Sequence, residues 1–443
     1  MESLNATTNL VDIFNNQTVL SLANSYLNNI GTFTINAIKV IFVLGLLIFI
    51  HELGHFLTAK AAGIKVHEFA LGFGRKLISF TKGETDYSIR LIPMGGFVRM
   101  EGEEEQSDDE RAFNKKPILA RLAVVIAGPL MNILLAVAIL FILVFISGNY
   151  ISNQIEEIQA GSGALKAGLK PGDKIIKLDE ENIRSWDDIN WYMIKTDKDN
   201  VIVTIVRNNQ VIQVPVETYT KLNFELDSYN QVKGLNQDSA LTKMGLKNGD
   251  KIRKINGMPV TKPDQVLNVI KSLKTKIITF SVLSKDKEID KPFDASLIRR
   301  NYMGVIPVQR AGSNSELVNY SFYKSFFLIK VMIQGVYDLV TGNVSVNQVM
   351  GPVGIISEIS SQKMIADLLW LAAIISLNLG IINLVPFPPL DGGKVLTLCL
   401  EAIRRKPIKP ETEAMISMIG FSLLILLMIV ATYNDVLRKI ATG

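Results

Sequence analysis

The sequence predicts a polytopic α-helical membrane protein with four transmembrane helices, a membrane-associated β-hairpin region and two inserted α+β domains. Three observations lead to this prediction. Four apolar stretches are long enough to cross a hydrocarbon core of about 30 Å, a glycine-punctuated stretch alternates in polarity, and a long insertion contains an internal repeat. A hydrophobic content of 48% in 443 residues agrees with membrane helices that carry soluble insertions.

The first membrane part is predicted over residues 35–149 and follows a polar N-terminal extension, residues 1–34. Its spans are expected at 35–60 and 118–147, where apolar residues are nearly continuous. Between them, alternation of apolar and polar residues, interrupted by glycine, predicts β-hairpins over 70–100.

The insertion after the second span contains a duplicated motif. The residues GLKPGDKI at 168–175 recur as GLKNGDKI at 245–252. A match of this length indicates two copies of one domain, expected over 150–225 and 226–310. The motif resembles that of PDZ domains in bacterial envelope proteases, and this resemblance implies peptide binding at a sheet edge. Copies that only fill space remain the alternative.

The second membrane part follows the insertion. Residues 311–345 are predicted to hold an amphipathic interfacial helix, because the apolar stretch 318–341 is broken by charged and amide side chains. Residues 346–443 contain the last two predicted spans, 366–387 and 412–433.

The distribution of Lys and Arg predicts the orientation in the membrane. The first 38 residues contain neither, whereas the segment between the first two spans and the short loop at 404–409 contain many. The positive-inside rule places both loops in the cytoplasm. Both termini and the insertion are then expected outside.

Composition also excludes some classes of partner and site. The net charge of +5 comes from cations that are interspersed with acids, so nucleic acid is not an expected partner. Cys399 is the single cysteine, which excludes an internal disulfide and a cysteine metal cluster.

A candidate metal site lies at the end of the first span, in the sequence HELGH. On a helix, His51 and His55 share one face and can both bind one Zn²⁺. Glu52 can accept a proton from a water molecule that the metal activates. Since a charged carboxylate at membrane depth is costly, this placement favours hydrolysis within or at the edge of a bilayer. His67 is expected to be an ordinary residue outside the site.

Two histidines leave a catalytic zinc short of one protein ligand. Asp391 is the best candidate, in the sequence NLVPFPPLDGG that ends the third span. The orientation argument puts this turn on the same side of the membrane as HELGH. A non-catalytic PDZ membrane scaffold with a structural zinc is the alternative. A zinc transporter is disfavoured, because its ligands would lie at several membrane depths.

These combined motifs resemble the site-2 protease family over nearly the whole chain after about residue 35. The resemblance implies zinc ligands at His51, His55 and Asp391, with Glu52 as the general base. It also implies a bacterial inner-membrane protein with a periplasmic insertion and periplasmic termini, in contact with lipid, whose active site faces the cytoplasmic side.

The same resemblance implies a substrate-binding region. Asn378 and Asn383 are expected near the active site, and the sheet that contains Gly95 and Gly96 is expected beside the metal. The implied substrates are single-span membrane proteins of the anti-sigma-factor type and remnant signal peptides. A helix must unwind before it is cut, and an edge strand can pair with the freed backbone groups.

Overall fold

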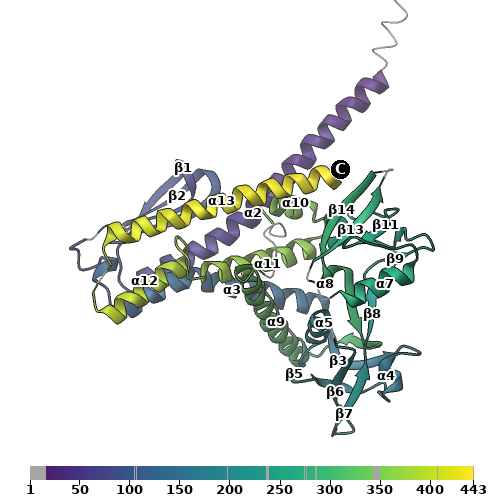
Figure 1. The fold of residues 1–443 in the computed structure, drawn as a ribbon. Coiled ribbons are helices and arrows are strands. Elements are labelled where there is room, and N and C mark those ends of the chain that lie inside the picture. Colours follow the sequence, from purple (N-terminus) through teal and green to yellow (C-terminus); the bar gives the residue numbers. More distant parts are fainter. Residues whose placement is uncertain are drawn as a thin grey trace, which may run out of the picture. The chain divides into compact units, whose positions relative to one another are not determined.

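The computed structural model describes residues 16–442 except 104, 106, 197, 236–238, 274, 276, 285–286, 343–349 and 407. The chain forms two compact units. The first comprises residues 1–136 and 352–425, and the second comprises residues 137–351 and 426–443. Each unit is described by itself (Figure 1).

Four helices in the described residues are long and apolar enough to cross a membrane. Their apolar segments are Gly31–Ala61, Ile118–Ser147, Ile365–Asn383 and Glu411–Leu437. They match the four predicted spans in order and approximate extent. The first segment belongs to a longer helix, α2 (Asn16–Ala61), so part of the expected polar extension continues the helix of the first span.

The helices of the first unit surround a core that also includes a sheet. Besides α2, they are α3 (Ile118–Ser147) up to residue 136, α10 (Pro352–Ser361), α11 (Ile365–Asn383), α12 (Asp391–Arg404) and α13 (Pro410–Thr442) up to residue 425. A short 3-10 turn, η1 (Phe113–Lys115), precedes α3. The core joins α2, the sheet, α3 and α12 through the buried side chains of Ala59, Phe69, Val98, Val124 and Leu398.

The predicted hairpin region is a sheet of two long, bent strands, β1 (Val66–Lys82) and β2 (Thr85–Met100). The start of β1 pairs with both ends of β2, so that Phe69 lies opposite Val98 on one side and Tyr87 on the other. Within the described chain, residues 96–100 pair only with the start of β1. Their second edge therefore has no strand partner.

This sheet also exposes many large apolar side chains. They are Phe73, Leu77, Ile78, Phe80, Ile89, Leu91 and Ile92. A patch of this size on a soluble surface would be unusual. It agrees with the expectation that the sheet lies against a membrane.

In the second unit, the first copy of the repeat forms a sheet in the order β16-β3-β4-β6-β7, with β5 paired to β4. Its strands and helices are β3 (Asn149–Ile158), α4 (Gly163–Lys166), β4 (Lys174–Leu178), β5 (Glu181–Asn182), α5 (Trp186–Lys195), β6 (Asn200–Arg207), β7 (Gln210–Glu217) and β16 (Val305–Ala311). Buried Val and Ile side chains of β4 and β6, including Ile175 and Val203, form its core.

The second copy has its own sheet, in the order β12-β11-β13-β14, and a separate core around Phe280. Its elements are α6 (Ala240–Lys243), β11 (Lys251–Ile255), β12 (Met258–Pro259), α7 (Pro263–Ser272), β13 (Ile277–Ser284), β14 (Lys287–Asp294) and α8 (Ala295–Ile298). Two small sheets complete the insertion, β8 (Tyr219–Leu222) with β15 (Arg299–Tyr302) and β9 (Glu225–Leu226) with β10 (Val232–Lys233).

The expected boundary of the second copy at residue 310 is wrong. Strand β16 follows the second copy in sequence, but it pairs with β3 of the first copy, for example Arg310 with Tyr150. The first sheet is thus closed by a strand from beyond the second copy. The repeat motif does not extend to these residues, so it gave no sign of the pairing.

The duplicated motif keeps the same contacts in both copies. The carboxylate of Asp173 binds Arg207 at 2.7 Å, and that of Asp250 binds Lys291 at 2.8 Å. Both aspartates are buried. In each copy the ion pair fixes the Gly-Asp turn to a distant strand.

Helix α9 (Asn314–Val340) corresponds to the predicted interfacial helix at 318–341. Ser313 and Glu316 form a capping box at its start. Lys324 binds Asp187 of α5 at 2.7 Å, so the helix is attached to the first copy of the repeat. Residues 343–349, at the end of the expected interfacial region, lie outside the described residues.

Candidate metal centre

Helix α2 positions two imidazoles on one face. His51 and His55 are four residues apart in the last turns of this helix, so their side chains point the same way. Gly54, between them, lies against the backbone of Ala127 in α3, and a Cβ at this position would collide with the Ala127 carbonyl. The glycine of HELGH therefore allows α3 to approach the two histidines closely.

Asp391 reaches the same place from the other end of the chain. It is the first residue of α12, after the proline-rich turn that follows α11. Cβ atoms at Gly392 and Gly393 would collide with the backbone of this turn, at Val385 and Pro388. The two glycines let the first turn of α12 fold back onto the loop.

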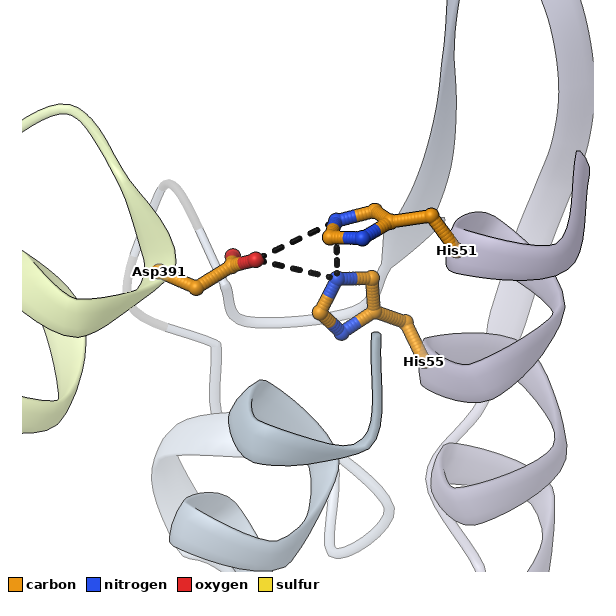
Figure 2. A group of neighbouring side chains, drawn as sticks. All are labelled: His51, His55 and Asp391. Carbon is orange, nitrogen blue, oxygen red and sulfur yellow. Dashed lines mark hydrogen bonds and ion pairs between the residues drawn. The ribbon is translucent and has the colours of Figure 1, made fainter. Parts of the chain in front are cut away.

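The three side chains converge (Figure 2). His51 Nε2 lies 3.2 Å from Asp391 Oδ2 and 3.2 Å from His55 Nε2, and His55 Nε2 lies 3.6 Å from Asp391 Oδ2. Tetrahedral ligands about 2.0–2.1 Å from zinc lie about 3.3 Å from one another. The three atoms have the chemistry and the spacing of a zinc site with one position left for water or substrate.

The centre is shielded from solvent but still accessible. The side chains of His51, His55 and Asp391 are 11%, 12% and 22% exposed. Burial raises the pKa of the Asp391 carboxyl, but hydrogen bonds with His51 and His55 outweigh burial and hold the pKa below its usual value. Asp391 is therefore a carboxylate at neutral pH, as a ligand to a dication must be.

Helix α3 contacts the far side of both imidazoles. His55 Nδ1 lies 2.8 Å from the carbonyl oxygen of Val124. His51 Nδ1 lies 3.3 Å from the side-chain nitrogen of Asn132. Gly128, between these two positions, lies under the His55 ring, where a Cβ would collide with it. The ring nitrogens that face away from the metal position are thus both at hydrogen-bonding distance from α3.

Glu52 lies beside the centre and against the sheet. Its carboxylate is close enough to interact electrostatically with His55, His51 and Asp391. A Cβ at Gly96 would lie 2.9 Å from Glu52 Cγ, so β2 passes directly next to this side chain. Gly96 is also at the start of the unpaired edge formed by residues 96–100.

The other residues expected at the site lie as follows. Gly95 has a positive φ and packs against the ring of Phe73. Asn378 is exposed on α11, and Asn383 is half-buried at the end of that helix. Neither amide makes a side-chain hydrogen bond within the described chain. His67 is outside the cluster and binds Glu101 at 2.6 Å, as expected of an ordinary residue.

Some contacts of the centre were not predicted. Asn132 was missed, although an amide in the middle of the apolar second span is a signal of function. In the acidic loop that precedes α3, Glu103 binds Lys394 of α12 at 2.6 Å. Arg121 of α3 makes a bidentate ion pair with Glu401 near the other end of α12, at 2.6 and 3.0 Å. Both pairs hold the helix that begins with Asp391.

Comparison with known proteins agrees with this geometry. The sequence pattern of peptidase family M50 matches residues 39–427. The zinc metalloprotease RasP of Geobacillus kaustophilus is 32% identical, over 90% of this chain and 97% of the relative. The regulator of sigma E protease of Haemophilus influenzae is 30% identical, over 94% of this chain and all of the relative. The regulator of sigma-W protease RasP of Bacillus subtilis is 28% identical over 92% of this chain.

The family match covers most of the chain and includes both HELGH and the turn that ends in Asp391. The relatives are aligned over almost their full length, so the resemblance is not confined to one domain. The chain therefore belongs to peptidase family M50, the site-2 proteases, and is a zinc metalloprotease that is integral to a membrane.

Proposed function

We propose that this protein is an intramembrane endopeptidase that cuts single-span membrane proteins in or next to their spans. The convergence of His51, His55 and Asp391 beside Glu52, at the end of an apolar helix, carries the proposal. A soluble metalloprotease has no need to place this cluster between membrane-spanning helices.

The chemistry follows from the positions of the side chains. Zinc held by His51, His55 and Asp391 would acidify a water molecule and polarise a peptide carbonyl. Glu52 accepts a proton from this water as its oxygen adds to the carbonyl carbon. Glu52 then gives the proton to the amide nitrogen as the C–N bond breaks, so that the leaving group departs as a neutral amine.

The edge at residues 96–100 is the proposed binding place for the unwound substrate. The backbone groups on this side of residues 96–100 have no strand partner in the described chain, whereas those on the other side pair with β1. The edge begins at Gly96, next to Glu52. An extended segment added to this edge would satisfy its own N–H and C=O groups in an apolar environment. Asn383 and Asn378, whose side-chain amides make no hydrogen bond to the residues that the structure describes, are proposed to bind the substrate backbone.

The remaining expectations complete the proposal. The two repeat domains act as PDZ domains on the periplasmic side of a bacterial inner membrane, where they exclude bulky ectodomains or bind peptides. The substrates are anti-sigma-factor-type proteins and remnant signal peptides. Two relatives carry the names regulator of sigma-W protease and regulator of sigma E protease, which supports this substrate class. The cation-rich loops support the orientation.

The test is cleavage of a tagged single-span substrate that lacks its ectodomain, in reconstituted vesicles. We expect wild type to cut within the span. The cleavage rate of Glu52→Gln should fall by at least about 100-fold, the usual rate contribution of a general base, while the variant retains zinc. Glu156→Gln, the same change on an exposed strand residue, is the matched control and should cut normally. Equal cleavage by wild type and Glu52→Gln would contradict the proposal, as would retained zinc with no cleavage by any variant.

A further inference from the structure

The ring nitrogens of His51 and His55 that face away from the metal position need hydrogen-bond acceptors. The Nε2 atoms of both rings face Asp391, so a metal in this position binds Nε2 and leaves the proton of each neutral imidazole on Nδ1. His55 Nδ1 has the carbonyl of Val124 as its acceptor, at 2.8 Å. For His51, the hydrogen-bonding group found at Nδ1 among the described residues belongs to a side chain.

Asn132 is the group placed to do this. It is fully buried, at 0% exposure, in the middle of α3, and its amide lies 3.3 Å from His51 Nδ1. Its oxygen, Oδ1, is buried without a hydrogen-bond partner among the described residues. A half-turn of the amide about Cβ–Cγ exchanges Nδ2 and Oδ1, and Oδ1 then faces Nδ1–H.

The backbone at this position is held independently of the amide. Ser376 of α11, also fully buried, donates its hydroxyl to the carbonyl oxygen of Asn132 at 2.8 Å. Gly380, one turn later, lies against Pro129 and Ile133 of α3. The contact of α11 with α3 therefore fixes where the Asn132 side chain starts, and leaves the amide free to serve His51.

We infer that Asn132 is a positioning residue that selects the metal-binding tautomer of His51 by accepting a hydrogen bond from Nδ1–H. Only this tautomer presents a free electron pair on Nε2. The inference deepens the proposed function, since it rests on zinc binding by His51, His55 and Asp391. Partners of this kind behind a metal ligand typically contribute a factor of about 10–100 to metal affinity.

The test measures zinc affinity of the full-length protein in detergent by competition with a chromophoric chelator. Asn132→Leu replaces the amide with an apolar side chain of similar size, and we expect it to weaken zinc binding by about 10–100-fold. Asn132→Ala is a second variant that removes the amide without adding branched carbons. Asn132→Asp keeps an acceptor and is expected to bind zinc within a few-fold of wild type.

Ser376→Ala is the matched control for helix packing. It removes a buried hydrogen bond at the same place but leaves the amide intact, so zinc affinity should change little. Equal losses in Asn132→Leu and Ser376→Ala, an unchanged affinity in Asn132→Leu or Asn132→Ala, or no rescue by Asn132→Asp would each overturn the inference.

His51→Ala separates this inference from the proposed function. If His51→Ala binds zinc as tightly as wild type, the metal centre itself is elsewhere and the proposed function fails. If His51→Ala loses zinc while Asn132→Leu retains it, the metal centre stands and only the role of Asn132 is overturned.

Discussion

At the scale of single residues, glycines decide how closely the backbone approaches the metal-binding side chains. Gly54 and Gly128 bring α2 and α3 together at the histidines, and Gly392 and Gly393 fold α12 onto its preceding turn. Gly96 brings β2 against Glu52. A few polar side chains perform the proposed chemistry, but the distances between them depend on these glycines.

The substitution Gly96→Val tests the close approach of β2 to Glu52. Gly96 is the least buried of these glycines. Its Cβ would lie 2.9 Å from Glu52 Cγ, 3.0 Å from the Ala70 carbonyl oxygen and 3.1 Å from Ile48 Cγ2. Glu52 or the strand must shift, and a shift of about 1 Å at an active site can cost about 100-fold in rate. We expect kcat/KM for a single-span substrate to fall by this order while zinc affinity is retained.

Gly45→Ala is the control for this prediction, because a Cβ at Gly45 in the same helix as Glu52 meets nothing within 4 Å. It should cleave like wild type. Normal kinetics in Gly96→Val would show that β2 does not approach Glu52 as described.

The sequence predicted these residues unequally. The spacing of HELGH is local, so the shared face of His51 and His55 followed directly from helix geometry. Asp391 could be proposed because it follows the third span on the side of the membrane expected for HELGH. Asn132 stands out in sequence as an amide within an apolar span, but its contact with His51 could not be predicted, because the register of α3 against α2 is set by packing that no local pattern specifies.

At the scale of elements, α12 is the part that must be held in place, since it begins with Asp391. Arg121 of α3 binds Glu401 of α12 through two hydrogen bonds, and their side chains are 10% and 16% exposed. The same stretch of α3 supplies the Val124 carbonyl to His55. The start of α3 thus contacts both α2, which holds two of the proposed zinc ligands, and α12, which holds the third.

Breaking this ion pair on one side should be costly. Arg121→Leu leaves the Glu401 carboxylate buried without its partner, which typically destabilises by about 3–5 kcal/mol. We expect a loss of this order in unfolding free energy, measured by denaturant titration in mixed micelles, together with weaker zinc binding.

The double variant Arg121→Leu, Glu401→Leu is the control, because replacing both members of a buried pair with apolar residues is often neutral or stabilising. It should recover most of the stability. If Arg121→Leu alone is as stable as wild type, the pair does not hold α12 to α3.

The helices and strands were predicted better than any other feature of this protein. Long apolar runs gave the four span candidates, and alternation gave the sheet of β1 and β2. The limits of the elements were less predictable. Polarity put the start of the first span near residue 35, but the helix that contains it already includes Asn16, because the hydrogen bonds of a helix do not require apolar side chains.

At the scale of the whole molecule, the start and the end of the insertion lie side by side. Asn149 at its start pairs with Ala311 at its end, and the N–H of Gly312 binds the carbonyl of Gly148 at 3.0 Å. The first sheet is therefore complete only when the chain has passed through the second copy. The repeat predicted the two copies, but β16 is a distant, non-repeated strand that could not be assigned from the motif.

This topology predicts how fragments of the insertion behave. Residues 149–311 contain two closed cores and should fold in water without detergent. Removing β16, in a fragment 149–304, should destabilise the first core by several kcal/mol, with a fall in Tm of about 4–8 °C for each kcal/mol. Two-dimensional NMR would follow both cores separately. Equal stability of the two fragments would contradict the pairing of β16 with β3.

The central claim concerns the metal centre, and zinc X-ray absorption of the purified protein tests it most directly. We expect one zinc per chain, with two imidazoles and further oxygen scatterers at about 2.0–2.1 Å. The chain has three histidines and one cysteine, so few other combinations of imidazole and thiolate ligands exist. A third imidazole, a sulfur scatterer at about 2.3 Å, or an unchanged spectrum in Asp391→Ala would contradict it.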